Sequence, residues 1–181
     1  MVNHQNNTKE SYELVKSMAA EKQDHTAINL LDNIGSPPWT NPRSFGKLRR
    51  IIRAYEGDVV SDYLMLEIGQ DYRSKETRAA YFAGEEFSFV KFVGFNADGM
   101  AQKIALDRCC INFKIPFYLL QGKNDLLTTP NVTKDYFQKI TAPSKEYILI
   151  DRSGHDPNLR MLEKQFDILK NGFVALVDKY L

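Results

Sequence analysis

The sequence predicts an α/β fold, in which a helical region is followed by a strand-helix-strand-helix unit with parallel strands. Across much of residues 1–111, apolar residues recur at spacings of three and four, which is the period of an amphipathic helix. After Asn112 the pattern changes to two short apolar runs, IPFYLL and KEYILI. A helical pattern separates these runs, and the right-handed crossover that it provides makes the two strands parallel.

Two helices are predicted before residue 36. The first runs from Thr8 to about Gln23. The second ends at Gly35, because glycine readily adopts the left-handed conformation that caps a helix. Their apolar stripes consist of Leu14, Val15, Met18 and Ala19 in the first helix and Ala27, Ile28, Leu31 and Ile34 in the second.

A connecting segment is predicted at Ser36-Pro37-Pro38-Trp39, because proline lacks the amide donor that a helix needs. A third helix is then expected, with Asn41 as its cap, Pro42 in its first turn and an end at Gly57. Weaker periodicity predicts two more helical stretches, at residues 78–93 and 97–109.

The second part of the chain, 112–181, is predicted to hold the sheet. Its first strand, Ile115 to Leu120, is continuously apolar, which suits a parallel strand buried on both faces. A helix opens at Thr129-Pro130, and Lys145 to Ile150 forms the second strand. The last helix is expected from about Asn158 to Tyr180, with Leu162, Phe166, Leu169 and Phe173 directed inward.

Composition excludes several classes of partner. The 24 Lys and Arg residues and 23 Asp and Glu residues leave a formal net charge of +1, which provides no broad field for nucleic acid or an anionic membrane. The first ten residues have no signal-peptide pattern, so we expect a cytoplasmic protein. The adjacent Cys109 and Cys110 are expected to be free thiols, and the spacings of zinc ligands are absent, so no metal is expected.

The residues best placed for chemistry follow the two predicted strands. Gly122-Lys123-Asn124-Asp125 follows the first strand, and Ser153-Gly154-His155-Asp156 follows the second. The carboxyl ends of parallel strands meet at one edge of a sheet, so Asp125 is expected to hydrogen-bond to His155 and to stabilise its charged form. The alternatives are a turn role for Asp125 and a loop or capping role for His155.

The stretches IPFYLLQGKNDLLTTP and KEYILIDRSGHDPNL resemble the acid loop and the histidine loop of the α/β-hydrolases, particularly the proline-iminopeptidase-like branch. The resemblance implies a partial α/β-hydrolase fold, with residues 1–111 as a helical cap and 112–181 as the C-terminal part of the core. It implies Asp125 as the catalytic acid and His155 as the base, substrates that are small amides or esters, most specifically N-terminal proline peptides, and no cofactor.

The nucleophile of that family has no counterpart here. Its serine lies in a G-x-S-x-G turn upstream of the cap, and none of the nine serines is flanked in this way. The resemblance therefore implies a truncated chain that is inactive alone. Because two strands do not form a stable sheet by themselves, we expect self-association or pairing with an N-terminal lobe. The alternative is a non-enzymatic protein-interaction module or a remnant without a role.

Three further residues are candidates for substrate binding. The resemblance makes Glu85 and Glu86 candidates for the cap carboxylates that bind a substrate's amino terminus in this branch, while their sequence context favours a solvated helix face. Trp39 is a candidate for lining the substrate groove, and packing is the alternative. Surface positions are expected for the remaining notable charges, which are His4, His25, Arg49, Arg50 and Arg53.

Overall fold

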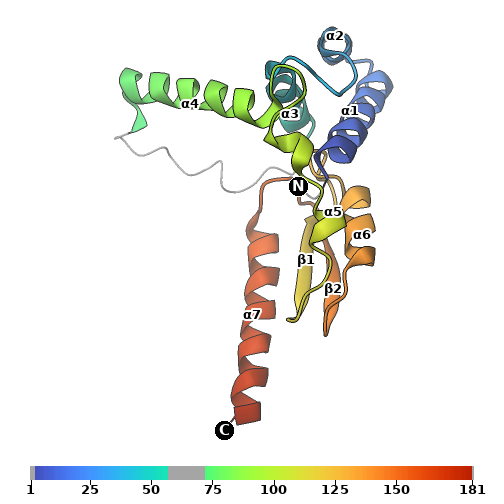
Figure 1. Cartoon of the computed structure of the whole chain (residues 1–181), viewed down its shortest axis with the longest axis vertical. Helices are drawn as coiled ribbons and strands as arrows, with labels where there is room; N and C mark the ends of the chain where they lie inside the picture. The colour runs from blue at the N-terminus through green and yellow to red at the C-terminus, as the bar shows by residue number, and fades with distance from the viewer. Residues whose placement is uncertain (1–2, 57–71, 181) are drawn as a thin grey trace.

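The computed structural model describes residues 3–56 and 72–180, with side chains up to residue 172. It has mixed α/β architecture, mostly helical, with two parallel strands in one sheet, which confirms the predicted class (Figure 1). Three helices come first, at His4–Glu21 (α1), His25–Ile34 (α2) and Arg43–Tyr55 (α3). The predicted third helix is thus confirmed up to Tyr55, and its predicted end at Gly57 lies outside the described residues.

Three ends of the first helices show the local signals that the sequence contains. Asn3 accepts a hydrogen bond from the Asn6 amide, so α1 begins four residues earlier than predicted. Gly35 follows α2 with a positive φ of 67°, which glycine adopts readily, although its ψ of 173° differs from that of the predicted left-handed cap. At α3, Pro42 occupies the cap position, while the Asn41 side chain accepts from the Arg43 amide at 3.0 Å.

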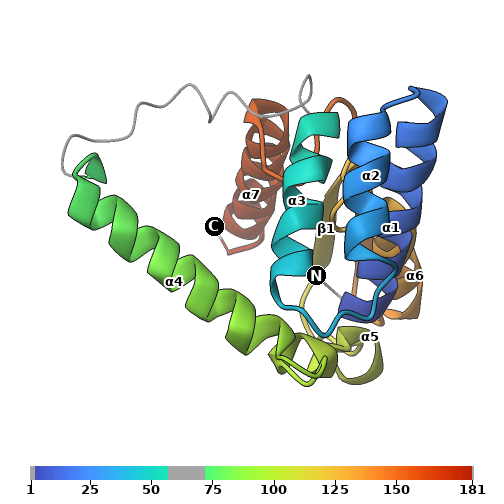
Figure 2. The same ribbon diagram turned by 90° about the horizontal axis from the view of Figure 1, so that it is seen from above.

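The segment after α4 differs from the prediction. Helix α4 spans Lys75–Val93, close to the expected range, and projects away from the other helices (Figure 2). The single helix predicted at residues 97–109 is wrong, because the structure has a 3₁₀ turn at Met100–Lys103 (η3) and a short helix at Leu106–Cys109 (α5). Ala97 has a φ of 53°, and this left-handed conformation at a non-glycine residue prevents a helix from starting there.

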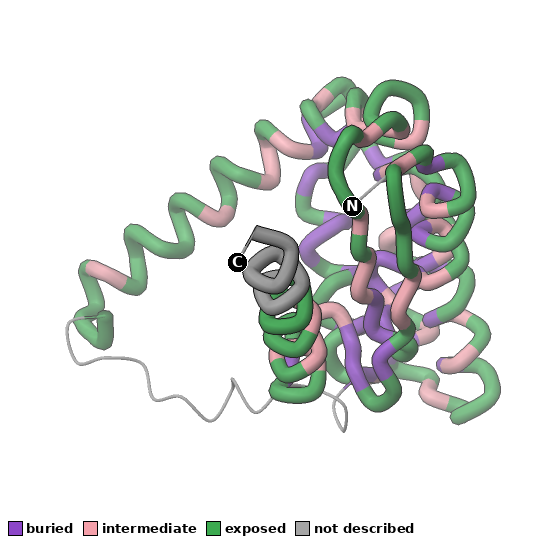
Figure 3. The backbone as a smooth tube through the Cα atoms, turned by 90° about the horizontal axis from the view of Figure 1, so that it is seen from below, coloured by how far each residue is buried: buried purple, intermediate pink, exposed green. Residues whose placement is uncertain are grey.

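The main core lies between α1, α2 and α3. Val15, Leu31 and Leu48 are fully buried there, and Leu127 joins them from the loop after the first strand. Buried residues are accordingly concentrated in these three helices, whereas most residues of α4 are exposed (Figure 3). The surface position expected for His4 is wrong, because α1 starts early enough to place its ring against the aromatic side chains of α3 and α4, and burial lowers its pKa.

The sheet consists of β1 (Phe117–Gly122) and β2 (Lys145–Ile150), joined by α6 (Pro130–Lys139). Phe117 pairs with Lys145 and Gly122 pairs with Ile150 in parallel register. One face of β1 packs on a second cluster around Tyr136 of α6 and Ile140, the residue that follows this helix. The prediction that β1 is buried on both faces is wrong, since Tyr118 on the opposite face is 45% exposed.

The last helix, α7, spans Leu159–Tyr180 and extends past the ends of both strands (Figure 1). Its 22 residues measure about 33 Å at 1.5 Å each, whereas a six-residue strand measures about 20 Å. The inward positions predicted for Phe166 and Leu169 are wrong, since these side chains are 64% and 63% exposed, whereas Leu162 is half-buried. The Phe173 side chain lies outside the described part. No described helix is long and apolar enough to cross a membrane.

Candidate active site

Two loops meet at the carboxyl ends of β1 and β2, where the sheet adjoins the helical core. The backbones touch: the Asn124 amide donates to the Ser153 carbonyl at 2.9 Å. A Cβ atom added at Gly122 would lie 2.2 Å from the Gly154 carbonyl oxygen and 2.6 Å from that of Ser153. Only glycine at 122 permits this approach, and the approach brings the side chains of both loops together.

The carboxylate of Asp125 and the ring of His155 are brought into contact by these loops. Asp125 Oδ2 lies 3.3 Å from His155 Nδ1. The Asp125 side chain is almost completely buried, whereas one third of the His155 side chain is exposed. The structure thus unites the two residues at the sheet edge where the sequence places them.

Asp125 also closes the turn that follows it. Its Oδ1 atom accepts hydrogen bonds from the amides of Leu127 at 2.9 Å and Thr128 at 2.7 Å. Its Oδ2 atom accepts from Thr128 Oγ1 at 2.5 Å and Gln121 Nε2 at 3.1 Å. Burial by itself would raise the pKa of Asp125, but the hydrogen bonds from His155 and Thr128 outweigh it and lower the pKa. One carboxylate therefore both closes the turn and contacts the His155 ring.

The His155 ring is held through one of its two nitrogens. Its Nδ1 atom contacts Asp125 and, at 3.2 Å, Thr128 Oγ1. The hydrogen bond to Asp125 raises the pKa of His155 against the lowering effect of burial. No side chain or backbone group in the described ranges hydrogen-bonds to Nε2. The ring is thus oriented on one side and open to proton transfer on the other.

Glu56 supports both loops, although the sequence pattern did not single it out. Its Oε1 atom accepts from the Leu126 amide at 2.7 Å, and its Oε2 atom accepts from the His155 amide at 3.4 Å. Burial raises the pKa of this carboxyl group. One sequence feature could have indicated this role of Glu56, which is its position at the C-terminal end of α3. The helix dipole disfavours a negative charge there unless other hydrogen-bond donors compensate.

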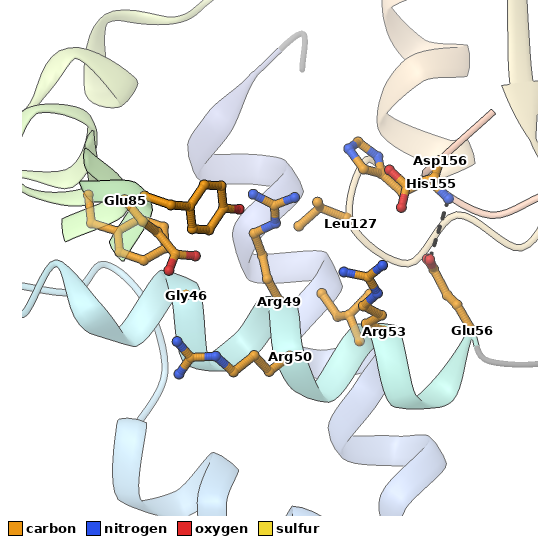
Figure 4. A pocket seen from close by; sticks show the side chains of 12 residues that line it. Gly46, Arg49, Arg50, Arg53, Glu56, Glu85, Leu127, His155 and Asp156 are labelled. Atoms are coloured by element: carbon orange, nitrogen blue, oxygen red, sulfur yellow. Dashed lines mark hydrogen bonds between the residues drawn. The ribbon is translucent and has the colours of Figure 1, made fainter. Parts of the chain in front are cut away.

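A pocket of about 170 Å³ opens beside His155. Helix α3 forms one wall of the pocket, and the loops that carry Leu127 and His155 form the opposite wall. Helix α4 contributes Glu85 (Figure 4). The charged residues that line it are Arg49, Arg50, Arg53, Glu56, Glu85, His155 and Asp156. The arginines are exposed, as the sequence indicated. The pocket therefore presents both signs of charge next to the imidazole.

The three candidate substrate-binding residues have different surroundings. Glu85 lines the pocket of His155. Glu86 is not among the lining residues of that pocket and pairs with Arg43 at 2.6 Å. Trp39 is buried in the helical core, where its Nε1 donates to the Gly35 carbonyl at 2.7 Å. The structure therefore brings Glu85 to His155 and leaves Trp39 and Glu86 elsewhere.

Possible metal ligands and the two cysteines were considered apart from the pocket of His155. Within residues 3–56 and 72–172, no three His, Cys, Asp or Glu side chains are grouped so that they could hold a metal ion. Cys109 and Cys110 are free and exposed, with their sulfur atoms 3.3 Å apart. They lie at the end of α5 and do not line the pocket of His155.

Fold and site together define an α/β protein with a carboxylate-imidazole pair at the carboxyl ends of parallel strands. The chain is 22% identical over 171 residues to a Bacillus subtilis (strain 168) protein named probable aminopeptidase YbaC. The alignment covers 88% of this chain and 50% of that protein, so the chain spans about half the length of the curated relative it matches. No model of a protein family and no solved structure matches the chain.

Proposed function

We propose that this chain supplies the acid and the base of an α/β-hydrolase-type active site that cleaves small amides or esters. In its most specific form, the proposal names peptides with an N-terminal proline as the substrates. The observation that carries the proposal is the 3.3 Å contact of Asp125 with His155 Nδ1, with Nε2 left open. The resemblance of the two loops to the proline-iminopeptidase-like branch and the distant relative named a probable aminopeptidase support it.

The mechanism assigns one task to each of the two residues. A serine hydroxyl attacks the substrate carbonyl while His155 Nε2 accepts its proton, and His155 then returns the proton to the leaving group. Asp125 holds the ring in the required tautomer and stabilises the imidazolium. Because no serine here lies in a G-x-S-x-G turn, we assign the nucleophile to a complementary lobe outside these 181 residues.

The substrate's amino group is assigned to Glu85. Its side chain reaches the pocket of His155 from α4, and a carboxylate there pairs with an ammonium group. The ion pair of Glu86 with Arg43 and the burial of Trp39 make both weaker candidates. Residues 1–111 accordingly act as the cap that recognises the substrate, and residues 112–181 act as the catalytic side.

The complementary lobe is proposed to cover the open side of the sheet and α7. Large apolar side chains are exposed there, and in the described part of the chain β1 hydrogen-bonds to β2 on one edge alone. Uncovered apolar surface and an unpaired strand edge favour association. The exposed apolar side chains are Tyr118, on the sheet face away from α6, and Phe166 and Leu169 on α7.

A second candidate function is a protein-interaction module without catalysis. The observation in its favour is the exposed aromatic surface of α4, where Tyr81, Phe82 and Phe87 are 55–69% exposed. Such patches mark interaction sites. In a module of this kind, Asp125→Asn and His155→Ala leave partner binding intact, whereas a hydrolase loses activity.

A chimera tests the hydrolase function directly. This chain replaces the half of the Bacillus subtilis relative that it matches, and hydrolysis of a proline aryl amide is measured. We expect turnover in the chimera and background rates for the chain alone. Asp125→Asn is expected to reduce kcat by about 10⁴-fold, because the ring loses its correct tautomer. His155→Ala is expected to reduce turnover to near background.

Matched controls separate catalysis from folding. Asp151→Asn removes a carboxylate whose side chain is 71% exposed and pairs with Lys123, so it is expected to leave the rate unchanged. His25→Ala, at an exposed position on α2, serves the same purpose for His155. A folded chimera that is inactive, or one whose rate survives both active-site changes, would contradict the proposed function.

A further inference from the structure

We propose that Arg49 and Arg53 form a subsite for the carboxylate of the substrate, so that the site selects short peptides with a free C-terminus. This inference rests on the proposed function and deepens it, because it names the substrate class. It begins from a contrast on α3: Arg43 is paired, whereas Arg49, Arg50 and Arg53 line the pocket of His155 without an ion-pair partner in the described part of the chain.

Helix geometry places the two arginines together. Positions 49 and 53 are four residues apart on α3, so their side chains lie on one face of the helix. Figure 4 shows Arg49 and Arg53 directed to the side of the pocket where Leu127 and His155 lie, whereas Arg50 extends the other way. Arg49 and His155 also line a second pocket, of about 490 Å³, on the Phe45 side.

Both guanidinium groups are available to a ligand. Arg43 on the same helix pairs with Glu86, but no ion pair between described residues involves Arg49 or Arg53. An arginine stays charged at all physiological pH values and binds a carboxylate through two parallel hydrogen bonds. Two such groups on one pocket wall therefore favour an anionic ligand.

The acidic residues of the pocket restrict that ligand further. Both Glu56 oxygens already accept backbone amides, which leaves Glu85 and Asp156 as carboxylates free to meet a cation. A ligand that matches arginines and carboxylates in one pocket carries an ammonium and a carboxylate itself. A free peptide has this chemistry at its two ends.

The pocket that is lined by both arginines and Glu85 is small. Its volume of about 170 Å³ is below the roughly 300–1,000 Å³ of sites that take drug-sized ligands. An extended residue spans at most about 3.3–3.6 Å, so the two charged ends of a dipeptide lie within about 7 Å of each other. A dipeptide with an N-terminal residue cleaved beside His155 therefore fits the charges and the space.

Calorimetric binding of three peptides to the full chain tests the subsite without requiring turnover. The probes are Pro-Gly, Pro-Gly amide, which lacks the carboxylate, and N-acetyl-Pro-Gly, which lacks the ammonium group. We expect Pro-Gly to bind about tenfold or more tightly than the amide, as charged hydrogen bonds are lost. Arg49→Gln and Arg53→Gln each reduce this preference, the double variant removes it, and Arg49→Lys retains part of it.

Lys47→Gln is the matched control, because it removes one positive charge from the exposed face of α3 outside the pocket of His155. It is expected to preserve the preference for Pro-Gly. Equal binding of Pro-Gly and its amide, or a preference that survives in the double arginine variant, overturns the carboxylate subsite. Equal binding of Pro-Gly and N-acetyl-Pro-Gly overturns instead the amine site of the proposed function. Binding of none of the three overturns both.

Discussion

Asp125 Oδ2 lies 3.3 Å from His155 Nδ1, although thirty positions separate the two residues in the chain. The contact couples their titrations, since it raises the pKa of His155 and lowers that of Asp125 against the effect of burial. The stabilisation from His155 is full below its unfolded pKa of about 6.5 and is lost as pH rises through its raised folded pKa. The stabilisation from Asp125 is present above about pH 3.9 and is lost as pH falls through its lowered folded pKa.

Asp125→Asn is predicted to lower the pKa of His155, because the opposing effect of burial then remains without the carboxylate. The imidazole resonances of His155 in an NMR pH titration measure this directly. Asp151→Asn, at an exposed position, is the control and is expected to leave the titration unchanged. A His155 pKa that is the same in the native chain and in Asp125→Asn would show that the pair is not formed in solution.

Gly122→Ala is predicted to destabilise the chain by about 1–3 kcal/mol, as its methyl group overpacks the contact between the two loops. The displacement is also expected to lower the pKa of His155. Gly84→Ala is the matched control: its Cβ meets nothing within 4 Å, so the change is expected to stabilise α4 by about 0.5–1 kcal/mol. Urea unfolding followed by circular dichroism compares the two, and equal stability of both variants would contradict the prediction.

Glu56→Ala is predicted to cost about 2–4 kcal/mol, because the amides of Leu126 and His155 lose their acceptor at a buried position. Glu56→Gln retains one acceptor oxygen and is expected to cost less. Glu13→Ala, on the exposed face of α1, is expected to change the free energy of unfolding by less than about 0.5 kcal/mol. Thermal or urea unfolding measures all three, and an Ala variant at position 56 as stable as the native chain would contradict the supporting role.

Replacement of Phe166 and Leu169 together by lysine is predicted to abolish self-association, because it places charge on the exposed apolar face of α7. Sedimentation velocity measures the change, and binding of a hydrophobic dye is expected to fall with it. Phe82→Lys, on the exposed surface of α4, is the control and is expected to leave association intact. A native chain that is monomeric and binds little dye would contradict the proposed open face.

Local patterns sufficed for much of the fold. The 3.6-residue period predicted the helices that contain Leu31 and Leu48, and two apolar runs predicted both strands. The candidate pair, Asp125 and His155, was also predictable, because parallel strands deliver the residues that follow them to one edge of the sheet.

Only the tertiary structure decided which surfaces are covered and which distant groups meet. Glu56 accepts amides 70 and 99 positions away, and no local pattern encodes such partners. Phe166 follows a helical stripe yet stays exposed, because a periodic pattern marks an apolar face without specifying whether anything packs on it. The sequence by itself thus determined most of the elements and the strand-end pair, whereas long-range packing determined the pocket beside His155.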